Sequence, residues 1–438
     1  MNLKITPIKN GLNGEVIAPG SKSYSHRAFI AASLADGISI IKNPLTSGDV
    51  AVTMNLLQLL GVRILKKDGN TYIVKRVKDA YRSYKKAIDC RNSGTTVRIF
   101  SALGLLIEGG LTLKGDFFNF KRPILPLLNA LEQLGGVFKL TDKKLKIKRK
   151  KVVCNKIKIQ GDISSQFITA LLILCPLIKC KNIDYIEIES LTPLSSKPFI
   201  NITLDILESF GINIQANFKD RKFYITNEQI YRSQSITIPG DFSSAAYILA
   251  AAVLSNKPSS IIIKNLNINN YQGDKIILEI FTQMGAKIKI DQENDWVLIN
   301  GDNRNSPLNG IEINCIEIPD LFPILSVIGA FAEGKTVLYN ASNQRLKETD
   351  RIAAMARELT KMGVKVIEEK DKLTIFHCDK ISGIKINHNN DHRIAMACSI
   401  AALFADSSSS IHNSNIVKDS YPSFYEDLKE LGANIEIL

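Results

Sequence analysis

The sequence of 438 residues has few of the side chains that build metal centres. Its five histidines form no HExxH or similar cluster, and none of its seven cysteines lies at CxxC spacing from another. An odd number of scattered cysteines is typical of reduced thiols in a cytoplasmic protein. We therefore expect neither a disulfide nor a zinc site, and we predict no metal or other cofactor.

Long apolar stretches are also lacking. The longest covers residues 167–178, which is too short to span a bilayer. Residues 1–16 lack the apolar core of a signal peptide and the Arg- and Ser-rich composition of a transit peptide. The sequence therefore predicts a cytoplasmic chain with no membrane partner.

Acidic residues are outnumbered, because 56 Lys and Arg face 43 Asp and Glu, which gives a net charge of +13. Such an excess fits nucleic acids, membrane surfaces or acidic small molecules as partners. The densest basic run, KKLKIKRKK at residues 143–151, contains no aromatic residue on which a base could stack. Leu145 and Ile147 alternate with its lysines, which predicts a strand with one solvated face. We therefore expect no nucleic-acid partner.

What the sequence does contain is a six-fold internal repeat. Six times a stretch with helical apolar spacing ends in a bulky residue and a glycine, and an alternating stretch follows, as in NALEQLGGVFKL. Glycine fits the left-handed end of a helix without steric cost, so each repeat predicts a helix followed by a strand. The glycines recur at intervals of 69 to 78 residues, at Gly61, Gly135, Gly211, Gly285, Gly363 and Gly432.

Six such repeats predict an α/β protein of two similar domains with three repeats each. Two Gly-Asp-x-Ser-Ser segments, which begin at Gly161 and Gly240, each precede an apolar run of small residues that predicts a buried helix. Pro239 and Gly240 predict a turn, and we place the domain boundary there. The predicted domains are residues 19–238, and residues 1–18 together with 239–438.

Five polar motifs in the first half of the chain stand where helices are predicted to begin. A helix amino terminus beside Lys or Arg favours anions, because free backbone amides and cations meet there. Taken singly, each motif is more often a helix cap or a loop than a binding site. The motifs are PGSKSYSHR at residues 19–27, RNSGTTVR at 91–98, KRP at 121–123, SSQ at 164–166 and SKPF at 196–199.

Three motifs in the second half carry candidate acid–base groups. RLKETDR places Lys347 and Arg351 on one face of a helix, with Glu348 between them as a candidate proton donor. NDHR puts Arg393 at the start of a buried helix, where its charge opposes the helix dipole unless an anion binds. IPD ends in Asp320, an acid that follows a predicted strand.

Taken together, these motifs resemble the 5-enolpyruvylshikimate-3-phosphate synthase family of enolpyruvyl transferases. PGSKSxSxR, NSGTxxR, RP, GDxSSQF, SKP, PD, RxKETDR and DHR occur in the family's order from Pro19 to Arg393. The resemblance implies two domains of three βαββαβ-like repeats, an inside-out α/β barrel, with the active site in the cleft between the domains. It also implies transfer of the enolpyruvyl group of phosphoenolpyruvate to the 5-hydroxyl of shikimate 3-phosphate, with release of phosphate, in the shikimate pathway to chorismate and the aromatic amino acids.

The resemblance further implies roles for individual residues. Lys22 would contact both substrates, Asp320 would accept the proton of the 5-hydroxyl, and Glu348 would protonate the methylene carbon of phosphoenolpyruvate. Besides Lys22, phosphoenolpyruvate would be bound by Gly94, Arg122, Gln166, Arg351 and Arg393. Besides Lys22 and Asp320, shikimate 3-phosphate would be bound by Ser23, Arg27, Ser164, Ser165, Gln166, Ser196, Asn343 and Lys347. Paired Arg and Lys side chains suit two ligands that each carry a carboxylate and a phosphate, so no metal is implied.

Three positions depart from the family pattern. Many members have a lysine before the Ser/Thr-aromatic-Pro segment near the carboxyl terminus, but here Asp419 stands there and Lys418 precedes it. Phe199 replaces a common tyrosine, and Ile99 replaces a proline that often follows the arginine of the second motif. Gly94 is the residue found in members that glyphosate inhibits, so we expect inhibition in competition with phosphoenolpyruvate. We also expect a monomer.

Two other functions account for part of the pattern. A related enolpyruvyl transferase acts on a UDP-amino sugar and needs a catalytic cysteine in a mobile loop rich in Gly and Arg. No cysteine of this sequence lies in such a loop. A basic nucleic-acid-binding protein would explain the net charge, but it would not explain RLKETDR, DHR and SSQ together.

Overall fold

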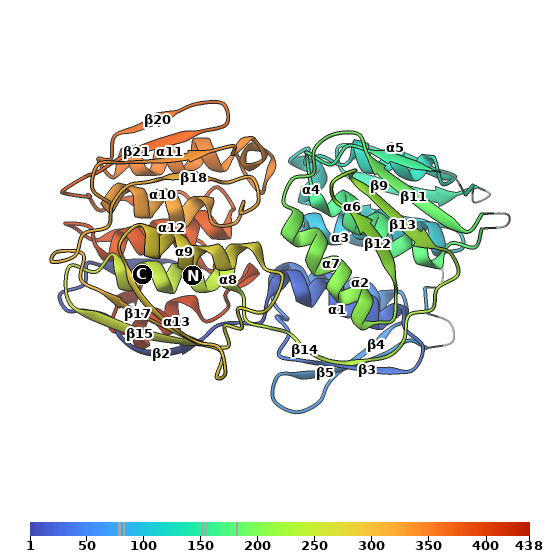
Figure 1. The fold of residues 1–438 in the computed structure, drawn as a ribbon, viewed down its shortest axis with the longest axis horizontal. Coiled ribbons are helices and arrows are strands. Elements are labelled where there is room, and N and C mark those ends of the chain that lie inside the picture. Colours follow the sequence, from blue (N-terminus) through green and yellow to red (C-terminus); the bar gives the residue numbers. More distant parts are fainter. Residues whose placement is uncertain (78–79, 82–83, 151–152, 155, 181–182) are drawn as a thin grey trace. The chain divides into compact units, whose positions relative to one another are not determined.

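The computed structural model describes residues 1–77, 80–81, 84–150, 153–154, 156–180 and 183–438, and the chain forms two compact units (Figure 1). Unit 1 consists of Met1–Ser21 and Pro239–Leu438, and unit 2 is the continuous segment Lys22–Ile238. Within these described ranges, no helix is both long and apolar enough to cross a membrane.

Unit 2 contains three four-stranded sheets. In each sheet the first two strands are parallel and the other neighbours are antiparallel. The first sheet has the strand order β14 (Ser235–Thr237), β3 (Ile38–Lys42), β5 (Thr71–Lys75) and β4 (Arg63–Lys66). The second has the order β6 (Ile88–Asp89), β7 (Leu111–Lys114), β9 (Lys144–Arg149) and β8 (Gly136–Leu140). The third has the order β10 (Ile157–Ile159), β11 (Tyr185–Ser190), β13 (Lys222–Thr226) and β12 (Ile214–Asn217).

Unit 1 also contains three four-stranded sheets, and two of them use strands from the amino terminus. They are β22 (Lys385–Ile386), β23 (Ser409–Ile411), β1 (Leu3–Thr6) and β24 (Asn434–Ile437); β18 (Glu312–Asn314), β19 (Lys335–Tyr339), β21 (Leu373–Phe376) and β20 (Val366–Glu368); and β2 (Asn13–Ile17), β15 (Ser259–Lys264), β17 (Trp296–Gly301) and β16 (Lys287–Asp291). β1 pairs with both β23 and β24, and β2 runs parallel to β15.

Within a complete repeat the chain forms a strand, a helix, a strand, a second helix and a hairpin. The order is thus βαβαββ, with the same six elements as the predicted βαββαβ-like pattern, and the α/β class is confirmed. The first helices of the repeats are α1 (Lys22–Leu34), α3 (Gly94–Leu103), α6 (Ser165–Leu174), α8 (Phe242–Val253), α10 (Phe322–Phe331) and α12 (His392–Leu403). The second helices are α2 (Gly48–Leu59), α5 (Leu125–Glu132), α7 (Lys197–Ser209), α9 (Ile277–Gln283), α11 (Arg351–Lys361) and α13 (Phe424–Glu430).

Short helices complete the described elements: α4 (Asp116–Asn119) and the 3₁₀ turns η1 (Gly104–Leu106), η2 (Cys175–Leu177), η3 (Gly273–Ile276), η4 (Ser342–Leu346) and η5 (Ser414–Asp419). The turns η3, η4 and η5 all belong to unit 1. Two of them carry residues of the motifs that the sequence analysis singled out, because η4 holds Asn343 and η5 holds Lys418 and Asp419.

The helices that the sequence predicts to be buried lie at the centre of each unit. In unit 1, α8, α10 and α12 pack against one another, and every residue of these three helices is buried. Strands β2, β15 and β17 lie on one side of them and β18, β20 and β21 on the other (Figure 1). A helix that is apolar on all sides belongs in a core, and the prediction of buried helices after both Gly-Asp-x-Ser-Ser segments is confirmed.

The six repeat glycines end the second helices as predicted. Each has a positive φ, between 79° and 112°, which is a backbone conformation that residues with a Cβ rarely adopt. A strand of the hairpin begins within a few residues of each glycine. The period in the sequence is therefore the period of the fold.

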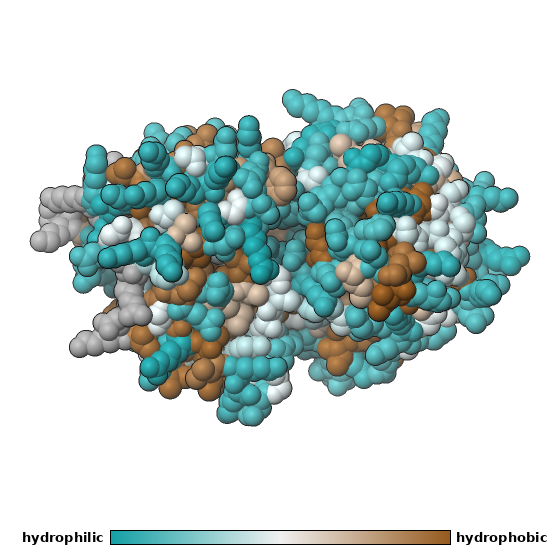
Figure 2. Space-filling model, turned by 180° about the vertical axis from the view of Figure 1, so that it is seen from behind, coloured by the Kyte–Doolittle hydropathy of each residue, from teal (hydrophilic) through white to brown (hydrophobic). Residues whose placement is uncertain are grey.

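The basic run of the sequence forms β9, with the predicted alternation. Leu145 and Ile147 are buried, while the lysines and Arg149 between and beside them are exposed. Lys151, the last residue of the run, lies outside the described residues. Hydrophilic residues also cover most of the molecular face that Figure 2 shows, with apolar residues in scattered groups. The strand with one solvated face is confirmed.

The prediction that no disulfide forms is wrong. Cys154 and Cys180 are joined, with their Cα atoms 5.6 Å apart. They lie 26 residues apart in the sequence, so no spacing rule connects them, and only the packing of the segments around β10 and β11 brings them together. The other cysteines are free, and all except Cys378 are buried.

Candidate active site

Arg27 joins the starts of three helices of unit 2. Its Nε donates to Thr203 Oγ1 (2.8 Å) on α7, and its Nη2 donates to Thr169 Oγ1 (3.2 Å) on α6 and to the carbonyl oxygen of Phe199 (3.1 Å). Its Nη1 donates to the carbonyl oxygen of Ser23 (2.9 Å). Burial lowers the pKa of Arg27 to about 10, which leaves it charged at neutral pH. Phe199 takes part through its backbone, so the absence of a tyrosine hydroxyl does not affect this contact.

Lys22 and Ser23 lie at the start of α1, and both are half-buried. The Lys22 ammonium pairs with the Asp49 carboxylate (2.8 Å) in the first turn of α2. The start of α2 is thereby joined to the group of helix amino termini around Arg27. Asp49 is a residue that the sequence analysis did not single out.

His26 connects the first motif with the second through a buried chain of hydroxyl groups. The His26 Nδ1 atom lies 2.8 Å from Thr53 Oγ1. Thr53 Oγ1 in turn lies 2.7 Å from Thr96 Oγ1, and Thr96 Oγ1 lies 2.7 Å from Ser93 Oγ. Ser93 caps α3. Burial lowers the pKa of His26 to about 3, so the imidazole is neutral, and its Nε2 has no hydrogen-bond partner among the described residues.

Gly94 allows two guanidinium groups to approach the backbone of α3. A Cβ atom at this position would lie 3.0 Å from Arg122 Nη2 and 3.1 Å from Arg98 Nη1. Arg122 also donates to the carbonyl oxygen of Asn92 (2.6 Å). Both guanidinium groups lie within 5.5 Å of the centre of the Phe117 ring, which places them in cation–π contact. The second and third predicted motifs thus form one cationic site beside the start of α3.

Gln166 ties the fourth motif to this site. Its side-chain oxygen accepts from Arg98 Nη1 (2.6 Å), and its side-chain nitrogen donates to Thr95 Oγ1 (3.0 Å). Arg98 also donates to the carbonyl oxygen of Pro123 (2.8 Å from Nη2). Arg98 stood in the second motif, but the sequence analysis gave it no role. Its central position follows from tertiary contacts that the motif does not reveal.

The three predicted phosphate-binding serines lie at the starts of two helices of unit 2. Ser164 caps α6 and accepts from the Gln166 backbone amide (3.3 Å), and Ser165 begins that helix. Ser196 caps α7 with a left-handed backbone, φ 55°. Ser165 and Ser196 are both buried. Helix amino termini carry partial positive charge, and five of them, those of α1, α2, α3, α6 and α7, are joined by the contacts above.

In unit 1, Asp320 lies between two arginines. Its Oδ1 accepts from Arg351 Nη1 (3.1 Å), and its Oδ2 accepts from Arg393 Nη2 (2.9 Å). Arg351 also donates from Nη2 to Glu348 (2.9 Å) and from Nε to Asp391 (2.8 Å). The structure therefore brings the two predicted acid–base residues onto one guanidinium group. Asp391 stood in the NDHR motif without an assigned role, and here it both caps α12 and orients Arg351.

Charge dominates the electrostatics of this cluster. Burial alone would raise the pKa of Asp320, but Arg393 and Arg351 outweigh it and hold the pKa well below its usual range. Arg351 is only 1% exposed, and the carboxylates around it keep its pKa well above the usual value despite burial. Arg393 Nε and Nη1 are buried and make no hydrogen bond to the described residues. Arg393 thus keeps two buried donors for which no hydrogen bond is found in the described chain, close to the Asp320 carboxylate.

The remaining predicted residues of unit 1 surround this cluster or lie apart from it. Asn343 is buried in η4 and accepts from Gln344 (2.9 Å), and Lys347 adds positive potential at Asp320. Lys418 is exposed and Asp419 half-buried, both in η5. Across the described part of the chain, no group of three His, Cys, Asp or Glu side chains is arranged to hold a metal ion.

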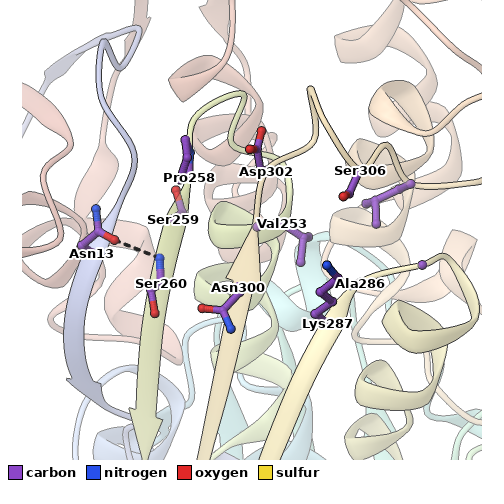
Figure 3. Close-up of a pocket in the computed structure, with 13 residues that line it drawn as sticks. Asn13, Val253, Pro258, Ser259, Ser260, Ala286, Lys287, Asn300, Asp302 and Ser306 are labelled. Carbon is purple, nitrogen blue, oxygen red and sulfur yellow. Dashed lines mark hydrogen bonds between the residues drawn. The ribbon is translucent and has the colours of Figure 1, made fainter.

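None of these residues lines the cavity shown in Figure 3. That cavity, about 320 Å³, opens in unit 1 near the ends of β16 and β17, where the side chains of Asn300 and Lys287 lie on neighbouring strands. A second cavity, about 350 Å³, lies in unit 2 between Leu105, Leu134 and Arg149. The candidate site is therefore neither of these two cavities, and it is identified by its charged side chains and helix amino termini.

Comparison with known proteins identifies the family. The family model described as EPSP synthase (3-phosphoshikimate 1-carboxyvinyltransferase) matches residues 6–428. The chain belongs to this family. It is 44% identical over 445 residues to 3-phosphoshikimate 1-carboxyvinyltransferase of Methanocaldococcus jannaschii, and 100% of each chain is covered. It is 41% identical over 434 residues to the protein of that name from Methanococcus maripaludis strain C5, with 98% of each chain covered.

Solved structures agree on the fold. An EPSP synthase from Acinetobacter baumannii superimposes with a TM-score of 0.79 at 24% identity, and 99% of each chain is covered. The enolpyruvyl transferase NikO from Streptomyces tendae gives the same TM-score at 18% identity, covering 99% of this chain and 98% of that one. At such identities the likeness shows the enolpyruvyl transferase fold alone. The family match therefore decides between the shikimate enzyme and other transferases of this fold.

Proposed function

We propose that this chain performs the reaction of its family with residues of both units. As a member of the EPSP synthase family, it transfers the enolpyruvyl group of phosphoenolpyruvate to shikimate 3-phosphate in the shikimate pathway. We assign the 5-hydroxyl group of shikimate 3-phosphate as the acceptor. The observation that carries the residue assignment is the Asp320 carboxylate between Arg351 and Arg393, with Glu348 on the Arg351 guanidinium.

Phosphoenolpyruvate binds, in this proposal, to Arg122 beside the backbone of Gly94 and to Arg393, which has buried donors without a hydrogen-bond partner in the described chain. Arg122 lies against Gly94, where no side chain blocks the approach of an anion to the start of α3. Arg393 retains two buried donors without partners in the described chain. Arg351, Gln166 and Lys22 complete this set. Planar guanidinium groups bind carboxylates and phosphates through two parallel hydrogen bonds, which orients the ligand.

Shikimate 3-phosphate binds to the helix starts of unit 2 and to polar side chains of unit 1. Ser164, Ser165 and Ser196 bind its phosphate at the amino termini of α6 and α7, where the helix dipoles favour negative charge. The other ligands in this proposal are Ser23, Arg27, Gln166 and Lys22 from unit 2 and Asn343, Lys347 and Asp320 from unit 1.

The reaction then proceeds by addition and elimination. Glu348, which must be protonated in the substrate complex, gives its proton to the methylene carbon of phosphoenolpyruvate, and C2 becomes cationic. The 5-oxygen attacks C2 while Asp320 takes its proton, which gives a tetrahedral intermediate. The carbon–oxygen bond to phosphate then breaks, the methyl group returns its proton to Glu348, and the proton on Asp320 leaves with the phosphate. General acid–base groups of this kind typically contribute about 10²–10⁴-fold to the rate.

Substrate charge makes Asp320 a better base. Without ligand, its two arginines hold its pKa below the usual range. Anionic substrates that bind Arg351 and Arg393 draw part of this positive charge away, and the pKa of Asp320 rises. A nearby opposite charge favours an ionised carboxyl, so its partial neutralisation favours proton uptake. The base is therefore activated by the binding of the substrates that need it.

We also propose that the enzyme acts as a cytoplasmic monomer. Each unit has its own hydrophobic core, so neither depends on a second copy for a core of its own. Light scattering during size-exclusion chromatography should give a mass near 48.5 kDa. A mass near twice that value would contradict the monomer.

The activity is tested by phosphate release from purified protein. We expect release only when phosphoenolpyruvate and shikimate 3-phosphate are both present, and we expect 5-enolpyruvylshikimate 3-phosphate as the product by mass spectrometry. Release with UDP-N-acetylglucosamine in place of shikimate 3-phosphate would instead support the amino-sugar enzyme. No release with either acceptor would overturn the proposal.

A further inference from the structure

A buried chain of hydrogen bonds links three helices of unit 2, and the reaction above gives it no role. It runs from His26 on α1 through Thr53 on α2 to Thr96 and Ser93 at the start of α3, and we call these four residues the His26 chain. His26 is 1% exposed, and the three hydroxyl side chains are fully buried. Each hydroxyl can donate one bond and accept another, so the chain is continuous for either neutral form of the imidazole ring.

The His26 chain lies one helical turn from the ion pair that holds Lys22. On α1, Lys22 precedes His26 by four residues, and on α2, Asp49 precedes Thr53 by four residues. Residues four apart share a face of a helix, so the ion pair (2.8 Å) and the His26–Thr53 bond (2.8 Å) are two adjacent links between the same two helix faces. α2 packs against both α1 and α3. The position of the Lys22 ammonium relative to α3 therefore depends on contacts that pass through α2.

At its other end the chain closes on the cap of α3. Ser93 Oγ accepts from the backbone amide of Thr96 (3.4 Å) and also bonds the Thr96 hydroxyl (2.7 Å). The Thr96 hydroxyl in turn bonds Thr53 (2.7 Å). The start of α3 is thus held from the protein interior, and it cannot shift without stretching these bonds.

The other residues of this segment contact the proposed binding site for phosphoenolpyruvate. The Asn92 carbonyl oxygen accepts from Arg122 (2.6 Å), and Thr95 Oγ1 accepts from Gln166 (3.0 Å). The backbone of Gly94 lies so close that an added Cβ would be 3.0 Å from Arg122 Nη2. A displacement of the start of α3 would therefore disturb several ligand-binding groups at once.

We propose that the His26 chain positions the start of α3 relative to Lys22 and thereby sets the affinity for phosphoenolpyruvate. This proposal rests on the proposed binding of phosphoenolpyruvate by Lys22, Arg122 and the backbone of Gly94. Protein interiors are close-packed, so a small shift of one helix start is passed on to the side chains that touch it. Shikimate 3-phosphate binds, in the proposed function, at the helix caps Ser164 and Ser196, which are not members of the chain. Its affinity should therefore respond less.

The experiment compares Thr53→Val with Thr53→Ser by steady-state kinetics, with each substrate varied in turn while the other is saturating. Valine keeps the shape of threonine without the hydroxyl, and serine keeps the hydroxyl without the methyl group. A misplacement of 1 Å can cost about 10²-fold, so a smaller shift in Thr53→Val should raise KM for phosphoenolpyruvate by about 10-fold. The kcat value and KM for shikimate 3-phosphate should stay within a few-fold of wild type. Thr53→Ser should restore KM for phosphoenolpyruvate, whereas a role in packing alone predicts the opposite order of the two variants.

A second break in the chain tests whether it acts as one unit. Thr96→Val should also raise KM for phosphoenolpyruvate, but the double variant with Thr53→Val should raise it no further, because one missing hydroxyl already interrupts the chain. Independent sites would instead multiply their effects. Thr336→Val is the control, because Thr336 is a buried threonine of unit 1 whose hydroxyl has no hydrogen-bond partner among the described residues. It should follow wild type in both KM values.

Three outcomes would overturn the proposal: an unchanged KM for phosphoenolpyruvate in both valine variants, an equal rise of both KM values, or multiplied effects in the double variant. If Thr53→Val does not fold, Thr96→Val with Thr96→Ser as its rescue decides in the same way. Failure of the proposed function is distinct, because wild type would then show no turnover of the two substrates.

Discussion

The two units hold their arginines in different ways. In unit 2, Arg27, Arg98 and Arg122 donate to hydroxyl, amide and carbonyl oxygens, and Arg98 and Arg122 also lie over the Phe117 ring. In unit 1, Arg351 and Arg393 donate to carboxylates. Neutral oxygens orient a guanidinium group and leave its charge to attract an anion, whereas carboxylates offset the charge and can exchange protons. Unit 2 is therefore built for anion binding, and unit 1 combines binding with proton transfer.

The largest expected effect tests whether proton transfer belongs to unit 1. Glu348→Gln keeps the shape and the acceptor for Arg351 but cannot supply a proton, so kcat should fall by about 10²–10⁴-fold with little change in KM. Ser165→Ala in unit 2 is the matched binding variant, and it should raise KM for shikimate 3-phosphate more than it lowers kcat. Steady-state kinetics with both substrates varied measures the two effects. A near-normal kcat for Glu348→Gln would assign the proton donor elsewhere.

The next effect concerns stability. Arg351→Ala leaves buried Asp391 and nearby Asp320 without their common cation, and loss of one partner of a buried ion pair typically costs about 3–5 kcal/mol. Arg27→Ala leaves mostly neutral acceptors unpaired, which costs about 1–3 kcal/mol each in buried positions. Denaturant unfolding followed by circular dichroism should therefore show the larger loss for Arg351→Ala. An equal or larger loss for Arg27→Ala would remove the contrast between the units.

Inhibition by glyphosate tests whether an anion binds beside Gly94 in unit 2. We expect glyphosate to inhibit wild type in competition with phosphoenolpyruvate. Gly94→Ala would place a methyl group 3.0 Å from Arg122 and 3.1 Å from Arg98, so both guanidinium groups must shift. Overpacking of about 1–3 kcal/mol corresponds to about a 5- to 150-fold rise in the inhibition constant.

Ser101→Ala, in the same helix with its hydroxyl on the Val97 carbonyl, serves as the control and should leave inhibition unchanged. Ile99 is buried in α3, and the absence of a proline there leaves the helix start to be positioned by Ser93 and by packing. Wild type that resists glyphosate, or unchanged inhibition of Gly94→Ala, would contradict the placement of the anion at Gly94.

A smaller effect distinguishes the units by the pH dependence of stability. Burial lowers the pKa of His26 to about 3 in the folded state. Below pH 6.5 the unfolded chain therefore binds a proton at His26 that the folded chain does not, and the free energy of unfolding falls as pH falls. Relative to His26→Gln, wild type should lose at most about 1.4 kcal/mol per pH unit between 6.5 and about 3. Asp274, a buried acid of unit 1, acts in the opposite direction, because its raised pKa removes stability as pH rises toward 7. Exposed His412 is the control: His412→Gln keeps His26 and should lose stability with falling pH just as wild type does, and a variant that instead behaves like His26→Gln would contradict the assignment.

We expect removal of metal ions to have no effect on activity. Cations of both units neutralise the substrates in this proposal, so prolonged treatment with EDTA should leave kcat and KM unchanged. Activity that falls with EDTA and returns with a divalent ion would show that the arginines and lysines do not suffice.

Much of this architecture could be predicted from the sequence, because it depends on local chemistry. The glycine at the end of each second helix, the small apolar residues of α8 and α12, and the alternation in β9 each act over a few residues. Local patterns were enough to predict these features. The motif residues of each unit also lie together, but this was implied by the family resemblance and depends on long-range hydrogen bonds between helix starts.

Features that depend on distant contacts could not be predicted. Arg98 and Asp391 stood in motifs, yet only the folded chain shows that they orient Gln166 and Arg351. The pairing of Cys154 with Cys180 has the same origin, because no spacing or composition rule selects two cysteines 26 residues apart.

The position of the first two strands has a consequence for synthesis of the protein. Unit 2 is complete once Ile238 has been made, so it can fold while the ribosome is still translating. β2 must wait for β15, and β1 must wait for β23 and β24, whose last residue is Ile437. β1 and β2 are therefore made well before their partners, and they must stay accessible until β15, β23 and β24 have been made.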